Sequence, residues 1–261
     1  MKIREVLVHK PGLELKTVDK PGKWLFSDNL NITAMQREHD DFTRILQDEG
    51  VRIHYLLKAT GKKPKLYLTR DSAVVVDKKA VTCHFIHSVR RGEEQLVKKR
   101  LKELGVKIVG HIFVPGFLHG SDLFFTDKDH AFACVGDRTN EEGIEHLEKI
   151  MNLNITQIPT GNLSNTQFNL INDIAIISEE ITQEPVCNIL KENGFDIIIA
   201  TREQREQMGL NFIQIDDYKI VNAKSDINKK LKMLGFDVIE ADIRELIKGK
   251  CGVRSMCLPF Y

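Results

Sequence analysis

The stretch KGKCGVRSMCLPFY, residues 248–261, decides the fold of this chain. Gly249 and Gly252 make its first half a tight loop, because glycine reaches backbone conformations that other residues avoid. The loop leads to Ser255, which is followed by Cys257 and Pro259.

The composition excludes several classes of protein. In 261 residues, 38 Lys and Arg nearly balance 37 Asp and Glu, so no net charge draws the chain to nucleic acid or to a membrane surface. No apolar run approaches the ~18 residues of a transmembrane helix. Five cysteines without a Cys-x-x-Cys pair indicate neither a disulfide framework nor a zinc site, so we expect no metal and no cofactor. We expect one soluble, cytoplasmic domain over residues 1–261.

One unit recurs along the sequence. A helical stretch with leucine-type anchors ends at a glycine or asparagine, and a short apolar strand follows. Glycine or asparagine at that place is typical of a helix end that needs a positive φ. The period is about 40 to 55 residues, which is in the range of repeat architectures. The five punctuating residues are Gly50, Gly105, Asn152, Gly194 and Gly235.

Pairs of short apolar segments lie between these units, so each unit is predicted as strand–strand–helix–strand. Five such units at nearly even spacing favour an α/β fold closed around an axis, a five-bladed β/α propeller. An ordinary open α/β sheet stays as the alternative. The predicted strand pairs are Lys65–Thr69 with Ala73–Val76, Leu123–Phe125 with Ala131–Val135, Phe168–Ile171 with Ile174–Ile177, and Phe212–Ile215 with Tyr218–Val221.

Several segments, in collinear order, resemble the pentein superfamily, the five-bladed β/α propellers that include arginine deiminases, dimethylargininases and glycine amidinotransferases. The resemblance covers nearly the whole chain and implies a single domain with that fold. Its segments are Leu25–Leu30 with Glu38–Phe42, Thr69–Asp71 with Arg90–Glu93, Leu118–Asp122 with Gly136–Asn140, Asp242–Leu246, and the closing stretch at 248–261.

The resemblance implies a two-step displacement at a guanidinium carbon, in which a cysteine thiolate attacks and a histidine serves as acid and base. Asp71 matches the aspartate that binds the guanidinium. Asp122 and Arg138 match an acid and the arginine that grips a substrate carboxylate. Asp28 keeps one acid of an early pair, and Ser27 replaces the other.

Three positions depart from that pattern. Ser255 stands at the nucleophile position, and His119 stands where a glutamate supports the catalytic histidine. The segment around Asn162, where that histidine is expected, contains none, and all nine histidines lie in the first 146 residues. A serine hydroxyl without an adjacent base is a poor nucleophile, so the ordinary mechanism of the superfamily is not expected here.

Some residues have two interpretations. If the closing stretch is a strand, Cys257 shares a face with Ser255 at ~6.6 Å and forms a relocated pair with His119; otherwise it is a small buried hydrophobe. His119 is either catalytic or a neutral, hydrogen-bonded cavity residue. Arg90 and Arg91 are interpreted as a solvated helix start.

The leading hypothesis is a pseudoenzyme of this superfamily that binds an arginine-like small molecule or a protein partner. The alternative is an active guanidine-modifying hydrolase, of arginine deiminase or dimethylargininase type, that cleaves a C–N bond with Cys257 or Ser255 and His119. A third hypothesis is a structural subunit paired with an active relative. Homo- and hetero-oligomers stay open.

Overall fold

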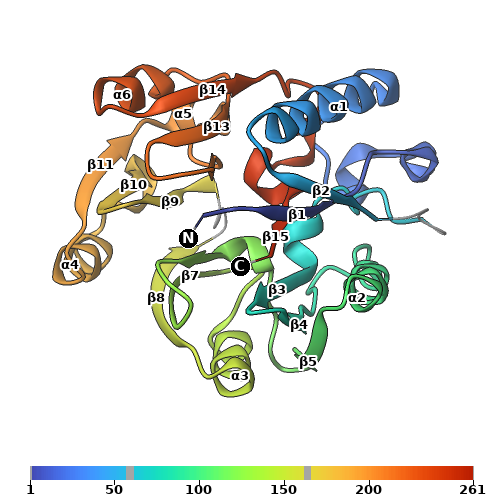
Figure 1. Cartoon of the computed structure of the whole chain (residues 1–261), viewed down its shortest axis with the longest axis horizontal. Coiled ribbons are helices and arrows are strands. Elements are labelled where there is room, and N and C mark those ends of the chain that lie inside the picture. The colour runs from blue at the N-terminus through green and yellow to red at the C-terminus, as the bar shows by residue number, and fades with distance from the viewer. Residues whose placement is uncertain (1, 57–61, 162–165, 261) are drawn as a thin grey trace.

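The computed structural model describes residues 2–56, 62–161 and 166–260. Its strands form five separate sheets of three strands each, arranged around a central region in Figure 1. In strand order, the sheets are β15 (Leu258–Pro259), β1 (Glu5–Val8) and β2 (Arg52–Tyr55); β3 (Ala73–Val76), β4 (Lys79–Thr82) and β5 (Lys107–His111); β6 (Leu123–Phe125), β7 (His130–Gly136) and β8 (Asn154–Gly161); β9 (Phe168–Ile171), β10 (Ile174–Ser178) and β11 (Asp196–Ala200); and β12 (Ile213–Gln214), β13 (Lys219–Ala223) and β14 (Asp237–Ala241).

Every sheet has the same internal pattern. Its middle strand runs antiparallel to the first strand and parallel to the third. A helix connects the middle strand to the third, and Figure 1 shows these helices on the outside. The predicted strand–strand–helix–strand unit is therefore confirmed. The connecting helices are α1 (Ile32–Asp48), α2 (Glu93–Glu103), α3 (Glu141–Met151), α4 (Glu184–Glu192) and α6 (Ile227–Met233), while α5 (Arg202–Glu206) is extra.

The five predicted helix ends all have the expected backbone. Gly50, Gly105, Asn152, Gly194 and Gly235 have φ between 55° and 92°. A side chain at such a φ is strained, except for asparagine, which tolerates the left-handed region. The repeat in the sequence therefore marks the turn from each helix into the third strand of its sheet.

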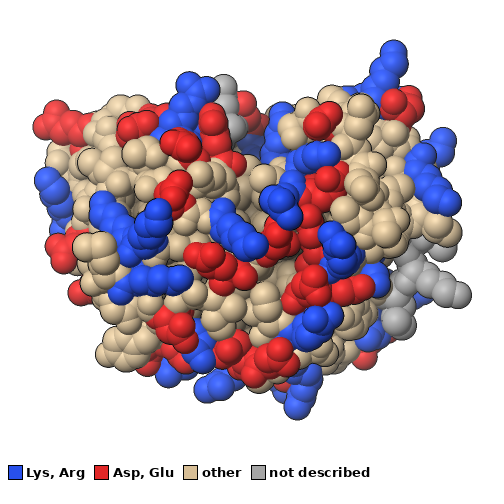
Figure 2. Space-filling model, turned by 90° about the horizontal axis from the view of Figure 1, so that it is seen from above, with Lys and Arg blue, Asp and Glu red and all other residues tan. Residues whose placement is uncertain are grey.

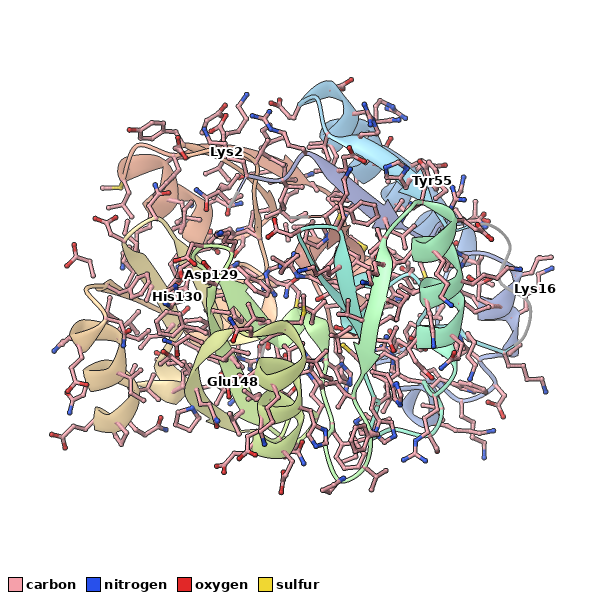
Figure 3. The ribbon with its side chains drawn as sticks, turned by 60° about the horizontal axis from the view of Figure 1, so that its bottom comes forward. Lys2, Lys16, Tyr55, Asp129, His130 and Glu148 are labelled. Atoms are coloured by element: carbon pink, nitrogen blue, oxygen red, sulfur yellow. The ribbon has the colours of Figure 1, made fainter. Side chains whose placement is uncertain are left out.

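The two ends of the chain meet in the first sheet. Leu7 of β1 pairs antiparallel with Leu258 of β15 and parallel with His54 of β2. The closing stretch thus completes the sheet that begins the chain. Polar contacts also link neighbouring units. Lys2 forms an ion pair with Asp217, and Arg100 of α2 donates a hydrogen bond to the backbone carbonyl of Tyr55. Lys2 and Tyr55 are labelled in Figure 3.

Two predicted strands are wrong. Lys65–Thr69 forms turns that lead into the 3₁₀ helix η3 (Thr69–Ser72), and β4 is the partner of β3 instead. The segment around Ser255 is the 3₁₀ helix η8 (Val253–Met256), so Ser255 and Cys257 do not share a strand face. In both cases short helical turns position buried polar side chains, and periodicity over four or five residues does not distinguish such turns from a strand.

The surface carries both signs of charge. Figure 2 shows Lys and Arg side chains interspersed with Asp and Glu over one face, as the near balance of charges predicts. Among the described residues, no helix is long and apolar enough to cross a membrane.

A close backbone approach positions the second unit against the third. The 3₁₀ helix η4 (Gly120–Asp122) packs against η3, and a Cβ added at Gly120 would lie 2.4 Å from the carbonyl oxygen of Arg70 and 2.5 Å from that of Ala73. Backbone oxygens cannot move aside as a flexible side chain can. Only glycine at this position allows η3 and η4 to bring their polar side chains together.

We predict that Gly120→Ala lowers the free energy of unfolding by about 1–3 kcal/mol, the usual cost of overpacking. Gly22→Ala is the control, because a Cβ there meets no atom within 4 Å. Urea unfolding followed by circular dichroism measures both. Equal stability of the two variants would contradict the close packing of η3 on η4.

Candidate functional site

A cavity of about 620 Å³ lies where the units converge. This volume is in the range of small-molecule sites. Its lining comes from loops, 3₁₀ helices and the helix α5 rather than from the strands. The polar residues that line it are Ser27, Lys65, Asp71, His87, Arg90, His119, Arg138, Thr166, Arg205, Glu206, Lys250, Cys251 and Ser255.

Asp71 is the acidic centre of one wall. It lies in η3 and is only 1% exposed. Its Oδ2 accepts from Nη1 of Arg90 at 2.5 Å, and its Oδ1 accepts from the hydroxyl of Ser121. Burial opposes the charged carboxylate, but the Arg90 guanidinium holds the pKa of Asp71 well below its usual range. Asp71 is therefore an ionised acid whose two oxygens both have donors within the protein.

Arg90 joins Asp71 to a second acid. Its Nε and Nη2 donate to Oε2 of Glu93 at 3.0 and 2.6 Å, and its guanidinium carbon lies 4.5 Å from the ring centre of Phe85. Arg90 is only 3% exposed. The interpretation of Arg90 as part of a solvated helix start is wrong, because two carboxylates in the interior bind it.

Asp122 and Arg138 form a second ion pair in the third unit. Nε and Nη2 of Arg138 donate to the two oxygens of Asp122 at 3.1 and 2.5 Å. Asp122 is fully buried and also accepts from the hydroxyl of Thr139 at 2.7 Å. The side chain of Arg138 keeps 22% exposure and lines the cavity. The acid therefore orients the arginine, and the arginine is the member of the pair that a ligand can contact.

The backbone around Ser255 is fixed by Asn211. The amide oxygen of this buried asparagine accepts from the backbone N–H groups of Gly252 and Ser255 at 3.1 and 3.2 Å, and from the Ser255 hydroxyl at 3.4 Å. Ser255 lines the cavity, as predicted. An amide oxygen is a very weak base, so this hydrogen bond orients the hydroxyl without activating it.

His119 lines the same cavity as Ser255 and Asp71. Its Nδ1 lies 3.6 Å from Oδ2 of Asp71, and within the described residues neither ring nitrogen has a hydrogen-bond partner. Burial, followed by the charge of Arg138, lowers the pKa of His119 to about 4 despite the opposing effect of Asp71. The imidazole is therefore neutral at neutral pH, as one interpretation predicted, but the part of the chain that the structure describes offers it no hydrogen bond.

The two C-terminal thiols differ in position. Cys257 is fully buried in the apolar core with Met35 and Met256 and does not line the cavity, so its pairing with His119 is wrong. Cys251 does line the cavity, and burial raises its pKa to about 11. Both cysteines are thiols at neutral pH, since burial also raises the pKa of Cys257.

Lys65 is a buried cation of the cavity wall. Its Nζ donates to the carbonyls of Leu25 and Gly249 at 2.8 and 2.6 Å and lies 4.2 Å from the ring centre of Phe26. Burial lowers the pKa of Lys65 to about 7, while the two carbonyls and the ring face favour the charged form. Lys65 thereby links the loop of Leu25 to the closing loop at Gly249.

The sequence placed most candidate residues at the cavity, but not all. Asp28 is wrong as a site residue: its side chain is 67% exposed and its Oδ1 accepts from the N–H of Asn29, while Ser27 lines the cavity. Asn162 lies outside the described residues. Lys65, Arg90 and Cys251 also line the cavity, and none of them was predicted as a lining residue. An Arg-x-x-Glu spacing at the start of a helix was the one signal available for Arg90.

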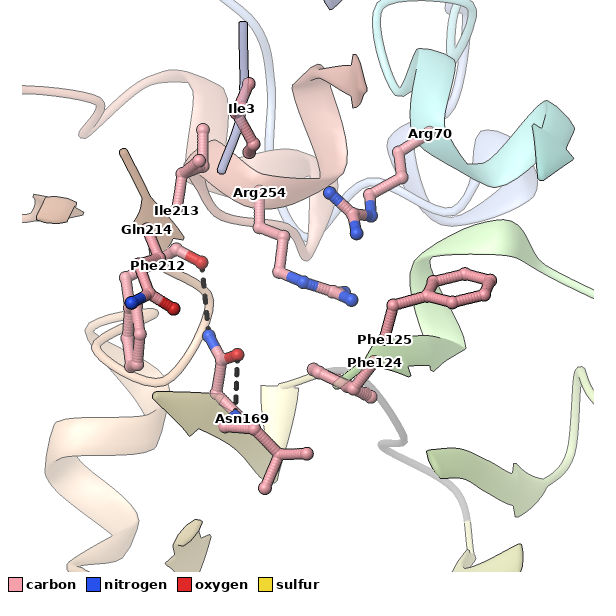
Figure 4. Close-up of a pocket in the computed structure, with 10 residues that line it drawn as sticks. Ile3, Arg70, Phe124, Phe125, Asn169, Phe212, Ile213, Gln214 and Arg254 are labelled. Carbon is pink, nitrogen blue, oxygen red and sulfur yellow. Dashed lines mark hydrogen bonds between the residues drawn. The ribbon is translucent and has the colours of Figure 1, made fainter. Parts of the chain in front are cut away.

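A second cavity, of about 50 Å³, lies beside Arg254 and shares no lining residue with the first (Figure 4). The guanidinium of Arg254 donates to the carbonyls of Ser121 and Leu123 and lies 3.8 Å from the ring centre of Phe124. This space is far smaller than a ligand pocket. Its role is structural, since Arg254 connects the closing stretch to the third sheet.

The pKa of His119 predicts a pH dependence of stability. Because the folded pKa of about 4 lies below the ordinary 6.5, the unfolded chain binds the proton first, and stability falls as the pH falls from 6.5 to about 4. The group contributes up to ~1.4 kcal/mol per pH unit. His119→Asn should flatten the dependence of unfolding free energy on pH in this window. Equal slopes in denaturant titrations of both proteins would contradict a neutral buried imidazole.

Comparisons with known proteins agree with the fold. The sequence model of the eukaryotic N,N dimethylarginine dimethylhydrolase family matches residues 23–261. A protein of Aeropyrum pernix is 29% identical over 202 residues, which cover 76% of this chain and 74% of that protein.

Two solved structures are similar over nearly their full lengths. A mutant dimethylargininase of Pseudomonas aeruginosa in complex with citrulline has a TM-score of 0.81 and 20% identity, with 100% of both chains covered. The N-terminal domain of ArgZ, a cyanobacterial arginine dihydrolase bound to product, has a TM-score of 0.87 and 16% identity, and covers 100% of this chain and 98% of that one. At such identities the likeness shows the fold alone. Because the family model covers nearly the whole sequence, the chain belongs to the dimethylarginine dimethylhydrolase family of the pentein superfamily.

Proposed function

We propose that this chain is a family member that keeps the ligand cavity without the cysteine–histidine chemistry, and that it binds a small arginine-related molecule or a protein partner. The observation that carries the proposal is that a serine, Ser255, lines the cavity at the position where the family's mechanism needs a cysteine thiolate. We further propose that residues 1–261 form one domain and that the five sheets are the blades of a propeller closed by β15.

The chemistry of the cavity supports this reading. Attack on a guanidinium carbon needs a strong nucleophile, and a serine hydroxyl is a much weaker one at neutral pH than a cysteine thiolate. The described thiols near the closing stretch are protonated, because burial raises their pKa. Loss of acid–base assistance alone costs on the order of 10²- to 10⁴-fold in rate. The weak nucleophile and the missing acid–base assistance both slow the first displacement step. We therefore expect this step to be too slow for measurable turnover.

The relatives suggest the class of ligand. The structures of two relatives are complexes, one with citrulline and one with ornithine. Both molecules are α-amino acids with a side chain similar to that of arginine. In this chain Arg138 lines the cavity and its orientation is fixed by Asp122. A guanidinium held in this way suits a carboxylate, with which it forms paired charge-assisted hydrogen bonds. We therefore propose that Arg138 binds the carboxylate of the ligand.

An active hydrolase remains the second candidate because His119 and Ser255 line one cavity. On that hypothesis His119 takes the proton of Ser255 and Asp71 orients the imidazole. The imidazole is a weak base here, since burial lowers its pKa to about 4. The two candidates differ in whether turnover depends on Ser255.

We predict no release of citrulline, ornithine or amine from arginine, N-methylated arginines or agmatine above the uncatalysed rate. An arginine deiminase assayed in parallel establishes the sensitivity. Turnover by the wild type that disappears in Ser255→Ala or His119→Asn, while Ser88→Ala retains it, would establish the hydrolase instead.

Thiol labelling tests the cysteines separately. We predict that a maleimide labels Cys187 first, because it is partly exposed, and that Cys257 is labelled last because the core buries it. Mass spectrometry of peptides at successive times measures the order, and Cys187→Ala serves as the control. Preferential labelling of Cys257, suppressed by arginine, would indicate the rewired site.

A further inference from the structure

Arg90 has the environment of a bound guanidinium ligand. One edge of its planar group donates to Asp71 at 2.5 Å, and another donates to Glu93 at 2.6 and 3.0 Å. Its face lies against the ring of Phe85, 4.5 Å from the ring centre. Two carboxylates and an aromatic face are the groups that recognise a guanidinium in proteins. Here a side chain of the same protein occupies them.

Asp71, the acid of this cluster that lines the cavity, already accepts hydrogen bonds with both of its oxygens. Oδ2 of Asp71 accepts from Arg90, and Oδ1 accepts from the Ser121 hydroxyl. Glu93 is fully buried and uses Oε2 for both of its bonds to Arg90. Glu93 lies outside the lining, where its Oε1 has no partner among the described residues. Arg90 is tethered to the site, so its effective concentration there is in the millimolar range or above. A ligand guanidinium would have to displace it and leave it without a carboxylate in the interior.

The other polar groups of the cavity are mainly donors. The guanidinium of Arg138 pairs with Asp122 and remains partly exposed to the cavity. Lys250 also lines the cavity, and its side chain is exposed. Glu206 is the other acid of the lining, and it pairs with Arg202 and Arg205. A ligand therefore meets cations and hydroxyls more often than unpaired acids.

We infer that Arg90 occupies the guanidinium position of this cavity, so that the cavity takes carboxylate-bearing molecules whose other end is uncharged and rejects those that end in a guanidinium. The inference rests on the proposed use of the cavity as a ligand site and determines which ligands it accepts. Arg90 acts here as a specificity-determining residue. On this account arginine and citrulline, which have nearly the same shape, differ in binding because of charge.

Removal of Arg90 should open the position to free guanidinium. In Arg90→Ala, guanidinium chloride at about 10 mM, far below denaturing concentrations, should raise the melting temperature by about 2–4 °C. Methylammonium chloride and sodium chloride at the same concentration should not. The wild type and Arg91→Ala, whose guanidinium bonds to the carbonyls of Phe85 and Ile86 outside the cavity lining, should not respond. If Arg90→Ala does not fold, the double variant Arg90→Ala with Glu93→Ala replaces it. The double variant loses one positive and one negative charge, so no net charge is added to the interior, and Asp71 stays available to bind guanidinium.

The inference is overturned if a folded Arg90→Ala variant is not stabilised by guanidinium, or if guanidinium raises the melting temperature of the wild type by the same amount.

The second experiment is calorimetry on the wild type, in which we expect citrulline to bind at least as tightly as arginine. Arginine that binds tenfold more tightly than citrulline would also overturn it. If the wild type binds neither, the proposed small-ligand function fails, while the guanidinium response of the variant still decides the place of Arg90.

Discussion

The buried ion cluster of Asp71, Arg90 and Glu93 is the interaction on which the rest of the site depends. All three residues are at most 3% exposed, and removing one partner of such a cluster costs about 3–5 kcal/mol. The cluster joins η3 to the start of α2, and the hydroxyl of Ser121 extends it to η4 of the next unit. The acidic wall of the cavity is therefore also a structural joint between two units.

The closing stretch meets this joint from the other side. Asn211 fixes the turn that carries Ser255, Arg254 reaches the carbonyls of the third unit, and Lys65 ties the loop at Gly249 to the second. Side chains of the cavity are thus held by contacts between units that are distant in the sequence.

The fold could be predicted from the sequence because its signals are local and repeated. Gly50, Gly105 and Asn152 mark helix ends by backbone conformation alone. The site was predicted in part by resemblance, which brought Asp71, His119, Arg138 and Ser255 to one cavity. Burial of Arg90 depends on an acid 19 residues away, and periodicity carries no such information. Asp28 shows that resemblance can miss the position of a site residue by one place in the sequence. Its neighbour Ser27 lines the cavity, and Asp28 does not.

A crystal structure of the wild-type protein soaked with arginine tests the central claim most directly. The account predicts that Arg90 remains within hydrogen-bonding distance of Asp71 and Glu93, and that any bound arginine contacts Arg138 through its carboxylate with no covalent bond to Ser255. A ligand guanidinium on Asp71 with Arg90 displaced, or a covalent adduct at Ser255, would contradict it.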